Sequence, residues 1–139
     1  MQLNISLWKW SRTAGHFLVA GALAWTMKLS VIVCTNGRII DTGASAFFMK
    51  IGLVMFIIGS TGIGSRLSHN RHLLLRAISI IVSPALVFGS FFLFGMITNP
   101  IFRGSGIWYA QQEAPIGLAV LVYIFVGYYL NRSPVTISR

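Results

Sequence analysis

Residues 77–97 read AISIIVSPALVFGSFFLFGMI, with no charged side chain at any position. A helix needs about 20 mostly apolar residues to cross the hydrocarbon core of a bilayer, and this stretch is long enough. Pro84 lies inside it. A proline removes a backbone donor and kinks a helix, but a transmembrane helix tolerates it when neighbouring groups bind the freed carbonyl. We therefore predict a membrane-spanning helix with a kink at Pro84.

Three further apolar stretches accompany this one, at residues 13–34, 43–64 and 115–130. The links between them are mostly short, and short links make successive helices antiparallel neighbours. Pro115 is expected in the first turn of the last helix, where its missing N–H costs nothing. The sequence thus predicts an all-α integral membrane protein, a single domain over residues 1–139 folded as a four-transmembrane-helix up-down bundle.

The composition agrees with a membrane location. The chain is 55% hydrophobic and 9% charged, whereas a soluble domain averages about 25% charged residues. A surface built from so few polar groups has to face lipid or another protein. The single cysteine, Cys34, excludes an internal disulfide and suggests no thiolate metal site.

The basic residues indicate the orientation of the bundle. Four spans place both termini and a basic loop, residues 65–76, on one side of the membrane. That side holds most of the basic residues outside the spans: Lys9, Arg12, Arg66, Arg71, Arg76, Arg132 and Arg139. Because cytoplasmic loops are enriched in Lys and Arg, we predict cytoplasmic termini and a bacterial cytoplasmic membrane. The scattered charges argue against nucleic-acid binding.

Two lysines, Lys28 and Lys50, lie inside predicted spans, roughly 10 Å below the outer boundary at 1.5 Å per residue. They are candidates for binding an anionic ligand or a lipid headgroup. The favoured interpretation is that each long side chain reaches up to the interface. No acidic residue is expected within a span, because Asp41 and Glu113 fall in links on the outer side.

Arg66, Arg71 and Arg76 recur every five residues in the basic loop. Each could contact an anionic lipid headgroup, worth about 1 kcal/mol near the surface. The same arginines would also act as plain determinants of topology. The sequence leaves both interpretations open.

Small residues spaced four apart are candidates for helix packing. Ala20 and Ala24 form one such pair, and Ser60 and Gly64 form another. Small side chains let helix backbones approach closely in membranes. The neighbour is either another helix of this chain or a second protein.

The outer connection, residues 98–114, carries Arg103, Trp108 and Tyr109. Aromatic side chains beside polar ones are typical of a segment lying in the membrane interface. We expect interfacial anchoring here, with a lid or a docking surface as the alternative.

The histidines do not assemble a convincing site. His69 and His72 lie three residues apart, but two ligands without a carboxylate or thiolate make a weak zinc site. His16 has no second histidine at spanning depth to share a haem. No nucleophile, base and acid are expected to meet. We predict no metal, no cofactor and no enzymatic activity.

These observations favour a non-catalytic subunit or accessory factor of a larger membrane complex. The alternative is a small homo-oligomeric channel or transporter for an anionic or lipid-like substrate, using Lys28 and Lys50. The expected partners are the lipid bilayer and either other membrane protein subunits or further copies of this chain. A membrane enzyme ranks last.

Overall fold

The computed structural model describes residues 2–132, and their side chains from Lys9 onward. This part of the chain forms four helices and no strand: α1 Gln2–Cys34, α2 Gly43–Leu67, α3 Leu73–Phe102 and α4 Ala110–Arg132. Each contains a stretch long and apolar enough to cross a membrane. The predicted all-helical architecture with four candidate spans is confirmed.

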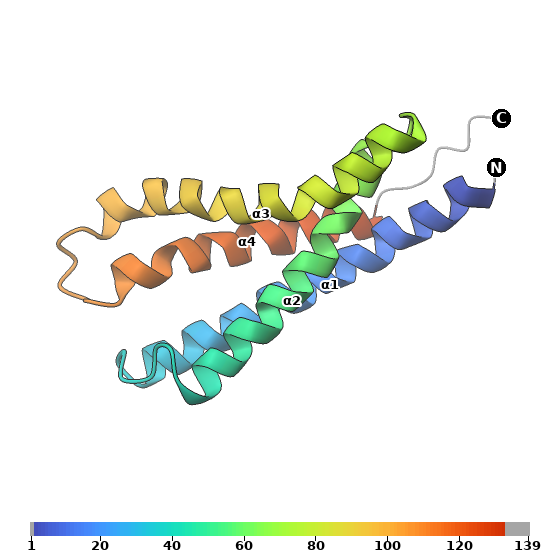
Figure 1. The fold of residues 1–139 in the computed structure, drawn as a ribbon. Helices are drawn as coiled ribbons and strands as arrows, with labels where there is room; N and C mark the ends of the chain where they lie inside the picture. Colours follow the sequence, from blue (N-terminus) through green and yellow to red (C-terminus); the bar gives the residue numbers. More distant parts are fainter. Residues whose placement is uncertain (1, 133–139) are drawn as a thin grey trace.

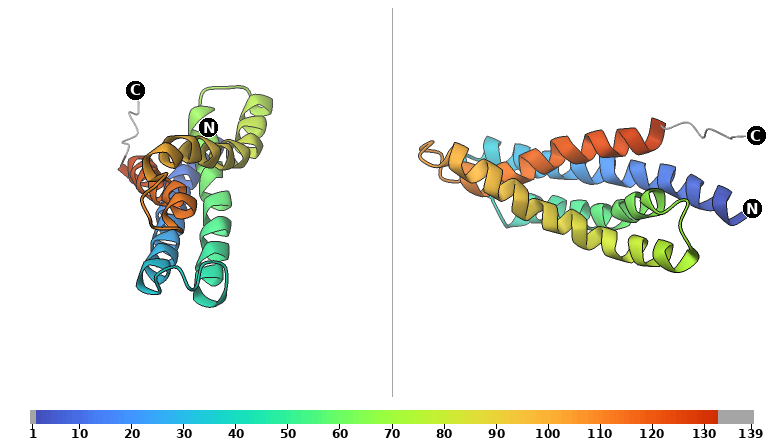
Figure 2. Two further views of the ribbon diagram at one scale, coloured as in Figure 1. Left: turned by 90° about the vertical axis from the view of Figure 1, so that its left-hand side faces the viewer. Right: turned by 90° about the horizontal axis from the view of Figure 1, so that it is seen from above.

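The four helices alternate in direction along the chain (Figure 1). α1 packs against α2 and α4, and α3 packs against the same two helices. The start of α1, the α2–α3 loop and the end of α4 lie together (Figure 2, right). We call this the basic end, defined by Lys9, Arg12, Arg66, Arg71, Arg76 and Arg132. At the opposite end α2 and α3 separate from each other (Figure 1).

The predicted limits of α1 and α2 match the structure where they face each other across a tight turn. Asn36 takes a left-handed conformation with φ of 49°. The amide of Asn36 donates to the Val33 carbonyl over 3.0 Å, and the amide of Gly37 donates to the Ile32 carbonyl over 2.8 Å. This pair of bonds is a Schellman cap. It satisfies carbonyls at the end of α1 and turns the chain toward α2, which begins at Gly43.

Two predicted connections are longer than the real ones. The basic loop was expected over 65–76 and covers only 68–72, so Arg66 belongs to α2 and Arg76 to α3. The outer connection was expected over 98–114 and covers only 103–109. Both differences have the same reason. A helix is held by backbone hydrogen bonds, which continue through polar residues beyond the end of an apolar stretch.

α4 begins five residues before Pro115, so the prediction that Pro115 occupies the first turn was wrong. The residues in front of it already make helical bonds, and the Glu113 amide donates to the Tyr109 carbonyl over 3.0 Å. Pro115 lacks only the N–H that would bind the Gln111 carbonyl, near the start of the helix. The helix continues despite the loss of this one hydrogen bond, so Glu113 lies within α4.

Pro84 lies inside α3, which continues as one helix and bends along its length (Figure 1). The proline cannot donate to the carbonyl four residues earlier, that of Ile80. The Ser83 hydroxyl donates to this carbonyl over 2.9 Å. A neighbouring serine therefore satisfies the freed backbone group within the helix itself.

One aromatic side chain from each helix meets at the centre of the bundle. Trp25 of α1 lies edge-on to Phe56 of α2, with ring centroids 4.8 Å apart. Tyr123 of α4 lies 5.2 Å from Phe56 and 5.9 Å from Phe91 of α3. Aromatic rings packed edge-to-face or tilted stabilise a fold by more than the burial of their apolar area alone. We call these four residues the central aromatic cluster.

Glycines bring α1 and α4 into backbone contact. A Cβ atom built on Gly127 would lie 2.7 Å from the Gly15 carbonyl oxygen, and one on Gly15 would lie 2.8 Å from the Gly127 carbonyl oxygen. No larger side chain fits at either position without moving a helix. This close approach brings the backbones of α1 and α4 together near the basic end.

Candidate functional site

A buried ion pair joins α1 to α4. The Lys28 ammonium lies 2.8 Å from Oε2 and 3.0 Å from Oε1 of Glu113. The two side chains are only 3% and 5% exposed. Glu113 lies in the first turn of α4, where the positive end of the helix dipole favours a carboxylate. Buried charges persist when they are paired and hydrogen-bonded, as these are.

The prediction that no acidic residue lies within a span was wrong. The candidate span of α4 runs over Ala110–Arg132 and includes Glu113. The error follows from starting the helix at Pro115. One signal was available in the sequence: Lys28 lies in an apolar segment, and the chain has only two acidic residues to pair with it.

Lys28 and Lys50 occupy different environments. The Lys28 side chain turns into the bundle and binds Glu113, so it does not extend to the interface as favoured from the sequence. Lys50 is exposed on α2. The structure therefore does not present the two ammonium groups as one cationic surface.

Two arginines of the basic end, Arg66 and Arg132, contact tyrosine rings of α4. The Arg66 guanidinium lies over the Tyr129 ring, 5.3 Å from its centroid, and the Arg132 guanidinium lies 4.4 Å from the centroid of Tyr128. A cation over an aromatic face is attracted by the ring electrons. Arg76 is buried in the first turn of α3, and Arg71 is exposed in the loop.

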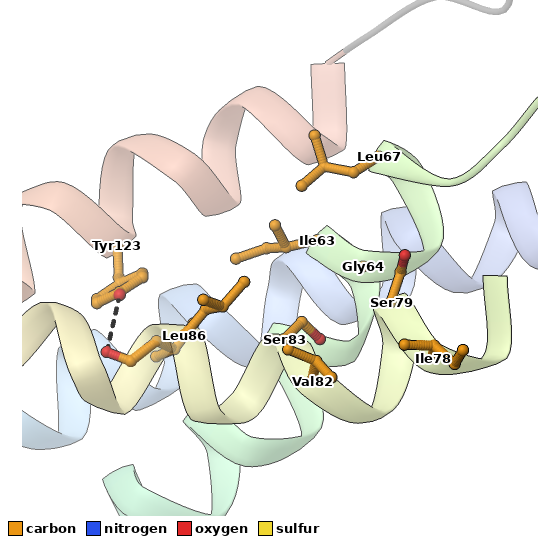
Figure 3. A pocket seen from close by; sticks show the side chains of 10 residues that line it. Ile63, Gly64, Leu67, Ile78, Ser79, Val82, Ser83, Leu86 and Tyr123 are labelled. Carbon is orange, nitrogen blue, oxygen red and sulfur yellow. Dashed lines mark hydrogen bonds between the residues drawn. The ribbon is translucent and has the colours of Figure 1, made fainter. Parts of the chain in front are cut away.

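A cavity of about 340 Å³ lies between α2, α3 and α4 toward the basic end (Figure 3). Ile63, Leu67, Val82 and Leu86 give it an apolar wall, and Tyr123 lies at its deep end. Its volume falls within the range of about 300–1,000 Å³ that is common for ligand sites.

The hydroxyl groups around this cavity are already engaged. Ser79 donates to the Leu75 carbonyl over 2.8 Å, and Ser83 donates to Ile80. The Tyr123 hydroxyl lies 2.5 Å from Ser90 Oγ and 3.3 Å from the Val87 carbonyl oxygen. The cavity therefore offers an apolar surface rather than a set of directed polar groups.

The candidate packing residues differ in their burial and in their contacts. Gly64 lies against α3, where a Cβ would come 2.3 Å from the Ser79 carbonyl oxygen. Ser60 is fully buried, Ala24 is buried at 9% exposure, and Ala20 faces outward. α1 also contacts α2 through Leu18, which meets Gly59, and through Trp25, which meets Gly52.

At the opposite end, the α3–α4 loop rests on the α1–α2 turn. A Cβ on Gly37 would lie 2.6 Å from the Tyr109 ring and 2.8 Å from the Trp108 ring. Trp108 remains 66% exposed, Tyr109 is half-buried, and Arg103 is exposed. The two aromatic residues thus hold the loops together beside the Lys28–Glu113 pair.

Among residues 2–132, no three histidine, cysteine or acidic side chains gather as a metal site. His16 lies 3.4 Å from the side-chain nitrogen of Asn131, and His69 and His72 are exposed. No protein-family model, curated protein or solved structure matches the chain. The interpretation of the site therefore rests on the geometry above.

Proposed function

We propose that this chain is a multi-pass membrane protein that serves as a non-catalytic subunit or accessory factor of a larger membrane complex. The membrane location is supported by the outward-facing apolar side chains. Phe92, Ile81 and Phe125 are 76%, 75% and 72% exposed. Exposed apolar surface costs about 25 cal/mol per Å² in water, and patches of this extent mark contact with lipid or protein.

The orientation follows from the charges. The basic end faces the cytoplasm, because cytoplasmic segments of membrane proteins are rich in Lys and Arg. The opposite end, with the α1–α2 and α3–α4 loops, lies outside. In a bacterium, this places the chain in the cytoplasmic membrane.

The proposed subunit role is supported mainly by the exposed face of α3. Only 11% of the most apolar stretch of α3 is buried within the chain, compared with 28–39% for the other helices. Ala85 and Gly89 face outward on this helix. Nothing lies within 4 Å of a Cβ built on Gly89. These small residues lie one turn apart, a spacing at which a second transmembrane helix can approach closely. The occupant of this face is a transmembrane helix of a partner subunit.

The channel alternative receives less support. It needs Lys28 and Lys50 as lining cations, but Glu113 neutralises Lys28 inside the bundle. A homo-oligomeric pore would therefore have to do without one of its two proposed binding groups.

The test is the mass of the native particle after gentle solubilisation. We expect several different chains in fixed stoichiometry. Gly89→Leu should release this chain from the particle, because it adds a bulky side chain to this face at a position where a Cβ meets no atom of its own chain within 4 Å. Ala20→Leu, an outward small-to-large change on α1, should leave the particle intact. A particle that contains this chain alone, in a defined number of copies, would overturn the proposal in favour of a homo-oligomer.

A further inference from the structure

We propose that the cavity between α2, α3 and α4 binds one anionic phospholipid of the cytoplasmic leaflet. The acyl chain occupies the cavity, and the phosphate binds at Arg66 and Arg71. On α3 the lining residues Val82 and Leu86 lie one turn from Ala85 and Gly89. The lipid site therefore borders the face used in the subunit proposal, and different variants test the two proposals. The site is also more specific than general contact with surrounding lipid.

The lining identifies the buried part of the ligand. The side chains that wall the cavity are mainly aliphatic, and its serine and tyrosine hydroxyls bind within the chain. A polar metabolite would lose its water without gaining hydrogen bonds in return. A hydrocarbon chain has no such requirement and gains from burial.

The length of the cavity matches one leaflet. Along α3 its lining runs from Ile78 near the basic end to Val87 at the level of Tyr123. Nine residues of helix span about 14 Å. Half of a bilayer's hydrocarbon core is about 15 Å thick. One acyl chain thus lies alongside α3 in its usual direction, with its headgroup at the basic end.

The mouth of the cavity identifies the headgroup. Leu67 lines the cavity at the end away from Tyr123 (Figure 3) and directly follows Arg66 in α2. Arg71 lies exposed in the following loop. Neither arginine has an acidic side chain beside it, because Asp41 and Glu113 both belong to the opposite end. Stacking on Tyr129 fixes the Arg66 guanidinium and leaves its N–H edge able to bind phosphate oxygens.

We expect the site to bind a lipid rather than free phosphate, because binding needs both the apolar cavity and the two arginines. Two exposed or half-buried arginines hold a small anion only weakly in water. The cavity supplies the hydrophobic gain, and the arginines select the sign of the headgroup charge. An anionic phospholipid combines the two in one molecule.

The experiment titrates the purified full chain in detergent with phosphatidylglycerol and, separately, with phosphatidylcholine of the same acyl chains. Native mass spectrometry counts the bound lipids. We expect one phosphatidylglycerol per chain at low lipid concentration, bound about thirtyfold more tightly than phosphatidylcholine. Equal binding of the two lipids, or several lipids bound without saturation, would overturn the proposal and indicate annular lipid only.

Matched variants separate the two parts of the site. The double variant Arg66→Gln, Arg71→Gln should weaken phosphatidylglycerol binding about thirtyfold, whereas Arg38→Gln, Arg103→Gln at the opposite end should not. Val82→Trp fills the cavity and should abolish binding. Ile81→Trp, one position away and outside the lining, should bind normally. Equal effects within either pair would contradict the site, and glycerol phosphate that competes as well as the lipid would show free phosphate binding instead.

Discussion

Lys28 and Glu113 lie 85 positions apart in the sequence and form a buried ion pair with a shortest N–O distance of 2.8 Å. The pair ties α1 to α4 at the opposite end of the bundle, where α2 and α3 have separated (Figure 1). At this level the ion pair and the loop aromatics Trp108 and Tyr109 link the two helical hairpins.

Removal of one member of this pair should destabilise the bundle strongly. Lys28→Met leaves the Glu113 carboxylate buried without its cation, and such a loss costs about 3–5 kcal/mol. The double variant Lys28→Met, Glu113→Leu should recover most of that stability, because apolar pairs often replace buried ion pairs without loss. The free energy of unfolding in detergent, measured for both single variants and the double variant, gives the coupling energy. Purely additive effects would mean that the two residues do not interact.

Ser83 should matter only because Pro84 follows it. Ser83→Ala removes the donor that satisfies the Ile80 carbonyl and should cost about 1 kcal/mol. In a Pro84→Ala background the new backbone N–H binds this carbonyl, so Ser83→Ala should then cost much less. Unfolding measurements on the four chains of this cycle provide the test. An equal cost in both backgrounds would show that the serine stabilises α3 in another way.

The proposed orientation predicts the labelling of Cys34. This single cysteine is exposed at the opposite end, which the orientation places outside. A membrane-impermeant maleimide should therefore label Cys34 in intact cells. In a Cys34→Ser background, a cysteine introduced by Asn70→Cys in the α2–α3 loop should react only after the cells are lysed. The reverse labelling pattern would show that the basic end faces the outside.

The sequence predicted the helices better than it predicted their ends. Hydropathy measures which residues cross an apolar layer, and that was enough to locate all four candidate spans. It does not report where backbone hydrogen bonding stops. Arg66 and Arg76 were therefore placed in a loop, although each lies in a terminal turn of a helix.

The pairing of Lys28 with Glu113 was missed at the sequence level for a different reason. Finding it required placing Glu113 in α4 and knowing that α1 and α4 are neighbours. Adjacency of helices at the two ends of a chain depends on packing, such as the contact of Gly15 with Gly127. Apolar segments of similar composition carry little information about which of them touch.

The central aromatic cluster has a consequence for the part that α4 plays in the fold. Each helix contributes one ring, and Tyr123 comes from α4. Without α4 the first three helices have an incomplete interior, because α4 supplies both Tyr123 and the Glu113 carboxylate that pairs with Lys28. A chain that lacks α4 would therefore leave Lys28 without its counter-ion and the central aromatic cluster open on one side.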